Sequence, residues 1–225
     1  MRLIDPDVQA YVDSAVPFCV KPLRGGRERP IRVARTLLTC SLAAAVLNEM
    51  GAMPETESAY VFVNVHNPAR TLHCTGVMHR WACRPDRASH PAWGINWAGA
   101  ALICRFLGAR LPRADEWVAF ASNNDPRRVY PWGNDPPSDA LANFGEHVGS
   151  TTPVGHFPAS DLGLCDLAGN LDEWCGDTDT RNPFERVVKG GAWSKDAHHL
   201  AIASHRSKWA RLGTTTIGLR PVWDD

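Results

Sequence analysis

Carboxylate and imidazole side chains, the groups that most often bind metals or transfer protons in proteins, gather in the last third of this 225-residue sequence. Asp172 and Glu173 stand side by side in the stretch GNLDEW, among turn-forming and apolar residues. Three histidines follow in the stretch SKDAHHLAIASHR, namely His198, His199 and His205. Two imidazoles and one carboxylate leave three faces of an octahedral metal open, which suits iron(II), manganese or cobalt.

The overall composition argues against several classes of protein. The 24 basic and 24 acidic residues give a formal net charge of zero, so no basic surface predicts a nucleic-acid partner. The sequence contains no GxGxxG, P-loop or GxSxG motif, and so offers no support for a nucleotide-dependent enzyme or a serine hydrolase. The seven cysteines are irregularly spaced without a CxxC pair, which argues against a zinc ribbon or a thioredoxin-like site.

The apolar segments predict neither a signal peptide nor a membrane span. The first residues, MRLIDPDVQAYVDSAVPF, place acidic residues and a proline where a signal peptide needs an apolar core. The longest apolar run, residues 37–47, is too short to cross a bilayer. We therefore expect a cytoplasmic protein without a membrane partner.

Two consecutive helices are the clearest predicted elements. The first covers residues 96–108, where Asn96 can cap the helix, apolar residues recur at helical spacing and Gly108 ends it. The second begins near Arg113 and buries Trp117. The pattern also predicts a helix over 41–51 and strands over 30–33, 60–65, 79–85, 186–193, 200–206 and 217–222.

Residues 123–166 carry no helical or strand pattern and are rich in Gly, Pro, Asn and Asp. An irregular stretch of this length is uncommon in a compact domain. We expect bound ions or buried aromatic side chains to hold it in place.

Five motifs in a fixed order resemble the formylglycine-generating enzyme, or sulfatase-modifying factor, family: HPAWGINWAGAALICRFLGARLPRADEWVAFAS, YPWGN, LCDLAGNLDEW, VVKGGAW and IGLRPV. The resemblance runs from about Phe18 to Val222. It implies an α+β, C-type-lectin-like fold with two helices, small twisted antiparallel sheets and long irregular loops. The chain would form a single domain over 1–225, with 1–17 as an N-terminal extension. Because the family includes oxidases, sulfoxide synthases and non-catalytic binding modules, the resemblance specifies the fold better than the activity.

The resemblance also implies calcium in the long loop. One site would use Asn143 and Glu146 with the carbonyl groups of Phe144 and Val148. A second would use Asp166 and Glu173 with Gly169 and Leu171. Carboxylates mixed with carbonyl oxygens are the ligands that calcium prefers. The alternative is that these polar groups cap turns without a metal.

The sequence departs from the family where that family binds copper. The oxidases of the family place two copper-binding cysteines after the GGSW-like motif, whereas this sequence has no cysteine there. Counting forward from Gly190, the two cysteine positions fall on Leu200 and His205. The resemblance therefore does not extend to copper-thiolate oxidation of a substrate cysteine.

A second departure falls in the same cleft, because the family usually has a Trp in the cleft floor at the position of Asp172. The cleft has thus lost an aromatic ring and a thiolate and gained a carboxylate and an imidazole. The hypothesis is that Asp172 and His205, together with His198 or His199, bind iron, manganese or cobalt in preference to copper. The alternative is that Asp172 caps a loop or supports a calcium site, and that the two adjacent histidines are solvated.

Three further side chains are predicted to bind a substrate. Arg206 would hold an anionic group, and Trp193 and Trp209 would stack on a planar ligand. With Asp172 and His205, Arg206 completes the predicted catalytic set. We expect a metal-dependent oxidase or oxygenase that acts with dioxygen on a small molecule in secondary-metabolite or cofactor tailoring. The alternative is a non-catalytic ligand- or protein-binding module, such as a variable protein of a diversity-generating retroelement, that displays residues 194–216.

Overall fold

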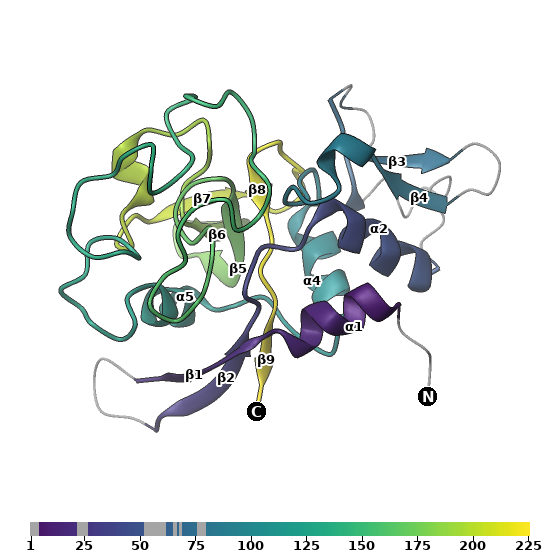
Figure 1. Ribbon diagram of the computed structural model, residues 1–225. Helices are drawn as coiled ribbons and strands as arrows, with labels where there is room; N and C mark the ends of the chain where they lie inside the picture. Colours follow the sequence, from purple (N-terminus) through teal and green to yellow (C-terminus); the bar gives the residue numbers. More distant parts are fainter. Residues whose placement is uncertain (1–4, 22–26, 52–61, 65–66, 68, 76–79) are drawn as a thin grey trace.

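A computed structural model describes residues 5–21, 27–51, 62–64, 67, 69–75 and 80–225 (Figure 1). The α-helices are α1 (Pro6–Asp13), α2 (Cys40–Glu49), α4 (Trp97–Phe106) and α5 (Ala114–Ala121). The strands are β1 (Val16–Val20), β2 (Arg29–Val33), β3 (Leu72–Thr75), β4 (Arg80–Cys83), β5 (Asp172–Asp179), β6 (Asn182–Lys189), β7 (Arg206–Trp209), β8 (Ile217–Gly218) and β9 (Val222–Asp224). Two short 3-10 helices are η1 (Pro85–Arg87) and η2 (Ala197–Leu200). The predicted α+β class is confirmed.

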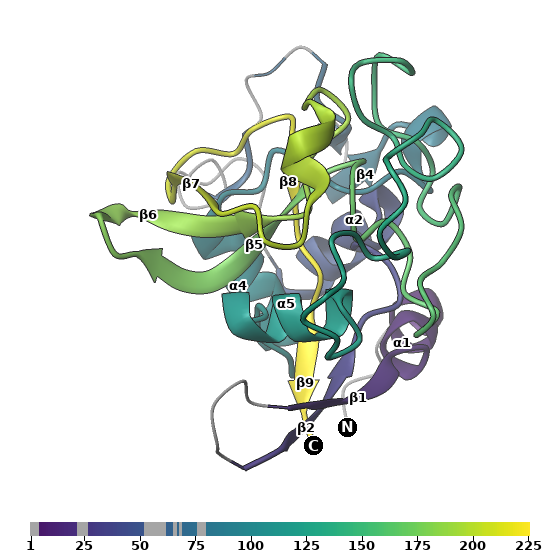
Figure 2. The same ribbon diagram turned by 90° about the vertical axis from the view of Figure 1, so that its left-hand side faces the viewer.

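The described strands form three small sheets, with the orders β1-β2-β9, β3-β4 and β7-β6-β5-β8. Figure 1 shows the β3–β4 hairpin beside α2, on the opposite side of the molecule from the sheet that contains β5. The predicted antiparallel pairing holds for every described pair except β5 with β8, which is parallel. Figure 2 shows the β5–β6 hairpin extending away from the rest of the molecule.

The two helices predicted with the clearest signals are present. The side chain of Asn96 accepts a hydrogen bond from the backbone N–H of Gly99 at 2.9 Å, so the predicted cap of α4 is confirmed. Gly108 has a φ of +67°, which favours glycine at this position after the end of the helix. Helix α5 buries Trp117 completely, as expected. No helix in the described ranges combines the length and the apolar character that crossing a lipid bilayer requires.

The prediction of two helices omitted α1 and treated its residues as part of an extension. The carboxylate of Asp5 accepts a hydrogen bond from the backbone N–H of Asp7 at 2.9 Å and so caps α1. Val8 and Tyr11 are buried in the same core cluster as residues of α2 and α4. The Tyr11 hydroxyl donates to the carbonyl of Thr36 at 2.9 Å. This segment therefore contributes to the core, because its two buried residues lie one helical turn apart on one face.

The late strands differ in part from their predicted positions. Strand β6 begins earlier than expected, and the sequence analysis missed β5 altogether. The predicted strand over 200–206 is wrong, because Leu200 ends η2, residues 201–205 form a bend, a turn and irregular chain, and β7 begins only at Arg206. The predicted strand over 60–65 lies largely outside the described residues, although Val63 forms a bridge with Ile95.

The long segment between α5 and β5 contains neither a helix nor a strand, as predicted. Side chains within it hydrogen-bond to its own backbone. The amide of Asn143 donates to the carbonyl of Ser150 at 2.8 Å, and the carboxylate of Asp166 accepts from the N–H of Gly155 at 2.7 Å. In a helix or a strand, backbone N–H and C=O groups bond to other backbone groups. In this segment, side chains provide hydrogen-bond partners for some of these groups.

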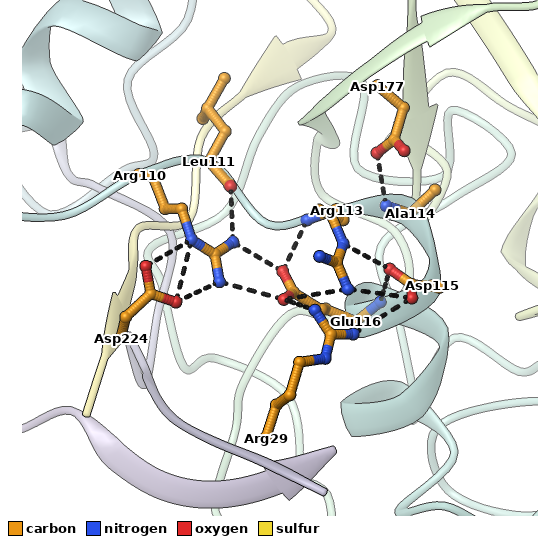
Figure 3. Close-up of polar contacts among 9 residues, drawn as sticks. All are labelled: Arg29, Arg110, Leu111, Arg113, Ala114, Asp115, Glu116, Asp177 and Asp224. Carbon is orange, nitrogen blue, oxygen red and sulfur yellow. Dashed lines mark hydrogen bonds and ion pairs between the residues drawn. The ribbon is translucent and has the colours of Figure 1, made fainter. Parts of the chain in front are cut away.

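A buried carboxylate holds the beginning of α5 against two strands (Figure 3). The side chain of Glu116 is fully buried and accepts hydrogen bonds from Arg110 at 2.7 and 3.0 Å and from Arg29 at 3.1 Å. It also accepts the backbone N–H of Arg113 at 2.9 Å, at the N-terminus of the helix. Arg110 in turn binds Asp224 of β9 at 2.9 Å. Glu116 therefore joins α5 to the β1–β2–β9 sheet.

We predict that Glu116→Gln lowers the free energy of unfolding by about 3 kcal/mol, because it leaves partly buried guanidinium groups without their shared counter-charge. Urea denaturation measures this change. The control is Asp115→Asn, which removes a carboxylate that is 61% exposed and binds the same arginines, Arg29 and Arg113. The control should change stability by less than about 0.5 kcal/mol. Equal effects of the two substitutions would show that burial of Glu116 does not matter.

Candidate functional site

A tight turn delivers Asp172 to the interior of the protein. Gly169 has a φ of +79°, and a Cβ atom there would lie 2.4 Å from the carbonyl oxygen of Asn143, so only glycine fits. Asn170 follows with a φ of +61° and bonds both backbone groups of Thr152 through its side chain. The chain then enters β5, where the N–H of Asp172 donates to the carbonyl of Thr216 at 2.9 Å.

The carboxylate of Asp172 is fully buried and binds the guanidinium of Arg206 through both of its oxygens. The Nη1–Oδ2 distance is 3.0 Å, and Nη2 donates to Oδ1. The two residues come from different strands, β5 and β7, and lie on the same face of the sheet because Arg206 is opposite Val188. A planar guanidinium with both arms on one carboxylate is a fixed geometry. Both oxygens of Asp172 are therefore occupied by Arg206.

One hydrogen-bond donor of Arg206 is not used in its ion pair with Asp172. Its side chain is only 15% exposed, and its Nε is buried without a hydrogen-bond partner among the described residues. Burial lowers the pKa of Arg206 to about 10, so the guanidinium remains charged at neutral pH. Asp172 orients this cation and neutralises it.

His205 lies apart from Asp172. Its imidazole is 53% exposed, and its Nε2 is 3.8 Å from the carboxylate of Asp179, a buried acid that Arg181 binds at 2.8 Å. It also lines a cavity of about 620 Å³ together with Lys189, and neither Asp172 nor Arg206 is among the lining residues. The structure therefore does not bring Asp172 and His205 together as ligands of one ion. Each of them has its own partner instead.

The other two predicted histidines do converge, on an acid that the sequence analysis did not select. Among the described residues, one group of three or more His, Cys, Asp or Glu places its ligand atoms within 4.8 Å of one another: Asp196, His198 and His199. Asp196 precedes η2, and its carbonyl accepts the backbone N–H of His199 at 3.0 Å. The spacing D-x-H-H was visible in the sequence, but only the 3-10 turn shows that the three side chains meet.

The histidine pair has the character of a ligand set. The two ring centroids are 3.8 Å apart. The Nδ1 atom of His199 is buried and has no hydrogen-bond partner in the described part of the chain. Burial, followed by the neighbouring His198, lowers the pKa of His199, which favours the neutral imidazole that binds metals. Asp196 and His198 are exposed, so the group is open to solvent.

Two lysines place additional positive charge next to this group and to Arg206. Lys208 is two residues beyond Arg206 on β7 and therefore on the same face of the strand. Burial lowers the pKa of Lys208, and the nearby charges of Lys195 and Arg206 lower it further. Lys195 also contributes to the lowered pKa of His199. Lys208 therefore feels the charges of Lys195 and Arg206, while Glu185 opposes them and Asp172 neutralises Arg206.

The two tryptophans predicted to line one cleft have different surroundings. Trp193 is partly buried against Trp93 and Leu171. Trp209 is 42% exposed and stacks on Phe184, with ring centroids 6.1 Å apart. The contacts thus place only Trp209 where a ligand ring could reach its face from solvent.

The two side chains predicted for the first calcium site, Asn143 and Glu146, differ in burial. Asn143 is fully buried, and its side-chain oxygen has no hydrogen-bond partner among the described residues. Glu146 is exposed, in a left-handed conformation with a φ of +62°, and its backbone N–H donates to the carbonyl of Trp193 at 2.8 Å. An unpartnered buried amide oxygen and an exposed carboxylate are both ligand types that calcium accepts.

The second predicted calcium site does not fit the structure. Both oxygens of Glu173 bind Arg220, at distances from 2.7 to 3.1 Å, and one of them also accepts the indole N–H of Trp117 at 2.9 Å. The other acid, Asp166, accepts the N–H of Gly155, and burial raises its pKa. With Glu173 neutralised by Arg220, the charge that this site would offer to calcium is already compensated.

The segment in which the resemblance places the copper-binding cysteines contains no cysteine. The last of the seven cysteines is Cys175, so the segment after the GGAW motif holds none. Cys175 is fully buried, and burial raises its pKa well above the ordinary value, which keeps the thiol protonated. The residues present therefore do not fit the copper site that the resemblance implies.

We predict strong coupling between Asp172 and Arg206. Asp172→Leu alone should lower the free energy of unfolding by about 3–5 kcal/mol, because it leaves a buried guanidinium without its counter-charge. The double variant Asp172→Leu with Arg206→Met should recover most of that loss, since apolar pairs can replace buried ion pairs. Urea denaturation of the four proteins in this double-mutant cycle gives the coupling energy. Additive effects of the two substitutions would contradict the pairing.

Comparison with known sequences identifies relatives of the chain. It is 33% identical over 154 residues to the serine/threonine-protein kinase Pkn1 of Chlamydia trachomatis, with 60% of this chain and 25% of the kinase covered. It is 32% identical to the inactive C-alpha-formylglycine-generating enzyme 2 of Bos taurus, covering 58% and 47%, and 31% identical to the formylglycine-generating enzyme of Mus musculus, covering 48% and 36%. The matched regions thus span about a quarter to a half of each relative.

Solved structures share the fold at low sequence identity. The Treponema denticola variable protein 1 superposes with a TM-score of 0.66 at 16% identity, covering 94% of this chain and 93% of that one. PvdO from Pseudomonas aeruginosa and CarF also reach 0.66, at 17% and 18% identity, with 94% of this chain covered and 92% and 96% of theirs. At these identities the similarity shows a common fold, which is the predicted C-type-lectin-like fold.

A profile of one sequence family matches most of the chain. It is described as the sulfatase-modifying factor enzyme 1-like domain, and it covers residues 50–225. This range includes β5, the ion pair of Asp172 with Arg206, and the group of Asp196, His198 and His199, which we call the Asp196 group. The chain therefore belongs to the sulfatase-modifying factor enzyme 1-like, or formylglycine-generating enzyme-like, family.

Proposed function

We propose that the chain is a metal-dependent oxidase or oxygenase whose metal is held by Asp196, His198 and His199. The observation that carries this proposal is the convergence of the three ligand atoms within 4.8 Å of one another. Ligands of a single ion lie somewhat closer together than this, so small side-chain rotations would complete the site. This set replaces the one expected around Asp172, whose oxygens bind Arg206.

The donors indicate the kind of metal. Two imidazoles and a carboxylate suit iron(II), manganese or cobalt, whereas copper(I) prefers the sulfur ligands that this segment lacks. The unpartnered Nδ1 of His199 is a buried donor or acceptor that a bound ion would satisfy. Such a metal, when bound, supplies open positions for a substrate and dioxygen.

The neighbouring cations indicate the substrate. Lys195 places positive charge near His199, and Lys208 lies near Lys195 and Arg206, with Glu185 and Asp172 as nearby acids. The chain's own contribution would be to bind and orient a small anionic molecule. Arg206 is suited to this task because the buried carboxylate fixes its guanidinium and its Nε is unused.

A second candidate function is a binding module without chemistry. It is favoured by the complete pairing of Asp172 with Arg206 and by the absence of cysteine after the GGAW motif. One relative is named an inactive formylglycine-generating enzyme, and one solved protein of this fold is named a variable protein. In such a module residues 194–216 would contact a ligand or a protein.

Elemental analysis of the purified protein separates the two functions. We predict near-stoichiometric iron, manganese or cobalt in the wild type, and at least a tenfold loss in His198→Ala and in Asp196→Asn. The control is His205→Ala, an exposed histidine outside the group, which should retain the metal. Dioxygen consumption should follow the metal content. A wild-type protein that binds none of these metals would contradict the enzyme and leave the binding module.

We also propose that Asn143 and Glu146 contribute to one calcium site. Adding calcium at about a hundredfold excess over its Kd stabilises a binding protein by about 2.7 kcal/mol, which for a chain of this size raises Tm by roughly 5–10 °C. Thermal unfolding with calcium and with a chelator measures the shift. Glu146→Gln should abolish most of it, whereas Asp139→Asn, an acid of the same loop that is 74% exposed, should not. An unchanged Tm in the wild type would contradict the site.

A further inference from the structure

Two aromatic rings lie exposed on the β6–β7 strand pair, and neither belongs to the proposed metal ligands. Phe184 is 66% exposed and Trp209 is 42% exposed. Their rings are parallel within 6°, with centroids 6.1 Å apart, and the backbone N–H of Ala210 donates to the carbonyl of Phe184 at 2.9 Å. A contiguous exposed apolar patch of this kind commonly marks a contact site. The strand pairing holds the two rings together, and we call this pair of exposed rings the aromatic platform.

A cavity borders this platform. Its volume is about 320 Å³, and it is lined by Pro183, Phe184, Arg186, Trp209, Ala210 and Arg211. This volume lies at the lower end of the range of small-molecule sites, roughly 300–1,000 Å³. The lining is apolar apart from two arginines. A ligand of one or two rings fits these dimensions better than a larger one.

The two arginines give the cavity a positive charge without a balancing acid among its described lining residues. Arg186 is held in place by hydrogen bonds from its Nη1 to the carbonyls of Pro183 and Glu185, and it lies 4.5 Å from the ring centroid of Trp97. Its Nε is buried without a hydrogen-bond partner in the described part of the chain. Arg211 lies 5.4 Å from the ring of Trp209.

We infer that this cavity binds a small planar aromatic molecule that carries a carboxylate or a phosphate. The ring of the ligand would stack on Trp209 and Phe184, because aromatic faces favour offset parallel contacts. Its anionic group would bind Arg186 and Arg211, which present several donors to one planar anion. The free Nε of Arg186 would gain a partner. Neither the rings nor the charges alone would select this class of ligand.

This site is independent of the proposed metal centre. None of its lining residues belongs to the Asp196 group, and its two rings lie on a different segment from η2. Loss of the metal therefore should not abolish binding at the aromatic platform. A negative result in the metal analysis would therefore leave this inference standing. A negative result for the aromatic platform would likewise leave the proposed metal site standing.

Isothermal titration calorimetry with three matched probes tests the inference. The probes are 1-naphthoate, 1-naphthyl phosphate and the neutral 1-naphthamide. We expect one or both anions to bind with a Kd below about 1 mM, and the amide to bind at least tenfold more weakly. The stronger of the two anions identifies the preferred acid. Weakening of that binding by added salt would confirm the role of the arginines.

Two substitutions and a control locate the binding. Trp209→Leu and Arg211→Gln should each weaken binding of the preferred anion at least tenfold, while thermal unfolding shows that both variants fold. The control is Leu212→Ser, which removes a neighbouring apolar side chain that is 49% exposed and outside the cavity lining. The inference is overturned if neither anion binds at millimolar concentration, if the amide binds equally well, or if Trp209→Leu has no effect. Self-association through this surface, measured by sedimentation, in place of probe binding would also overturn it.

Discussion

Two consecutive acids on β5, each neutralised by a different arginine, are the interaction around which the rest of this structure is arranged. Asp172 and Glu173 are adjacent in an extended strand, so their side chains point to opposite faces of the sheet. Arg206 of β7 binds the first, and Arg220 binds the second. Both carboxylates are fully buried. Removing one partner of such a pair leaves an uncompensated charge in the interior. The stability lost in this way is far larger than the net contribution of the pair itself.

The Glu173 half of this arrangement connects distant parts of the chain. Arg220 is fully buried and also donates to the carbonyls of Ala34, Arg35 and Cys165 at 2.7–3.0 Å. One residue thereby connects β5, the chain after β2 and the end of the long irregular segment. Figure 1 shows β8 and the chain that leads to β9 running through the middle of the molecule, between these parts. The irregular loops can be long because their ends are fixed by buried charge-assisted hydrogen bonds.

The Asp172 half explains why the proposed metal site differs from the one that the sequence predicted. A carboxylate in an apolar stretch can face a metal or an arginine, and the residue types alone do not distinguish the two. The hypothesis that Asp172 and His205 share an ion depended on residues 33 positions apart being brought together. The strand register instead places Arg206 on the face of Asp172, and His205, its neighbour in the chain, lies near Asp179. Asp196 was not predicted because its closeness to the two histidines depends on a 3-10 turn that carries no periodic pattern.

Local signals were sufficient for the helices α4 and α5, but not for every element and not for the contacts between elements. The caps and apolar spacing of α4 and α5 are short-range properties, and these helices formed where predicted. The order of the motifs was sufficient to predict the fold. Helix α1 was missed because its two core residues, Val8 and Tyr11, give a weak pattern, although their burial is complete or nearly so. The segment 200–206 has the alternation of a strand but has no neighbour with which to pair before Arg206.

The central claim is that this divergent family member moved its metal chemistry from sulfur ligands to the Asp196 group. Anomalous diffraction from crystals of the wild-type protein grown with manganese(II) tests it most directly. The account predicts one strong anomalous peak within bonding distance of Asp196, His198 and His199, and its absence in crystals of the His198→Ala variant. A peak between Asp172 and His205, or no peak at either place in well-ordered crystals, would contradict it.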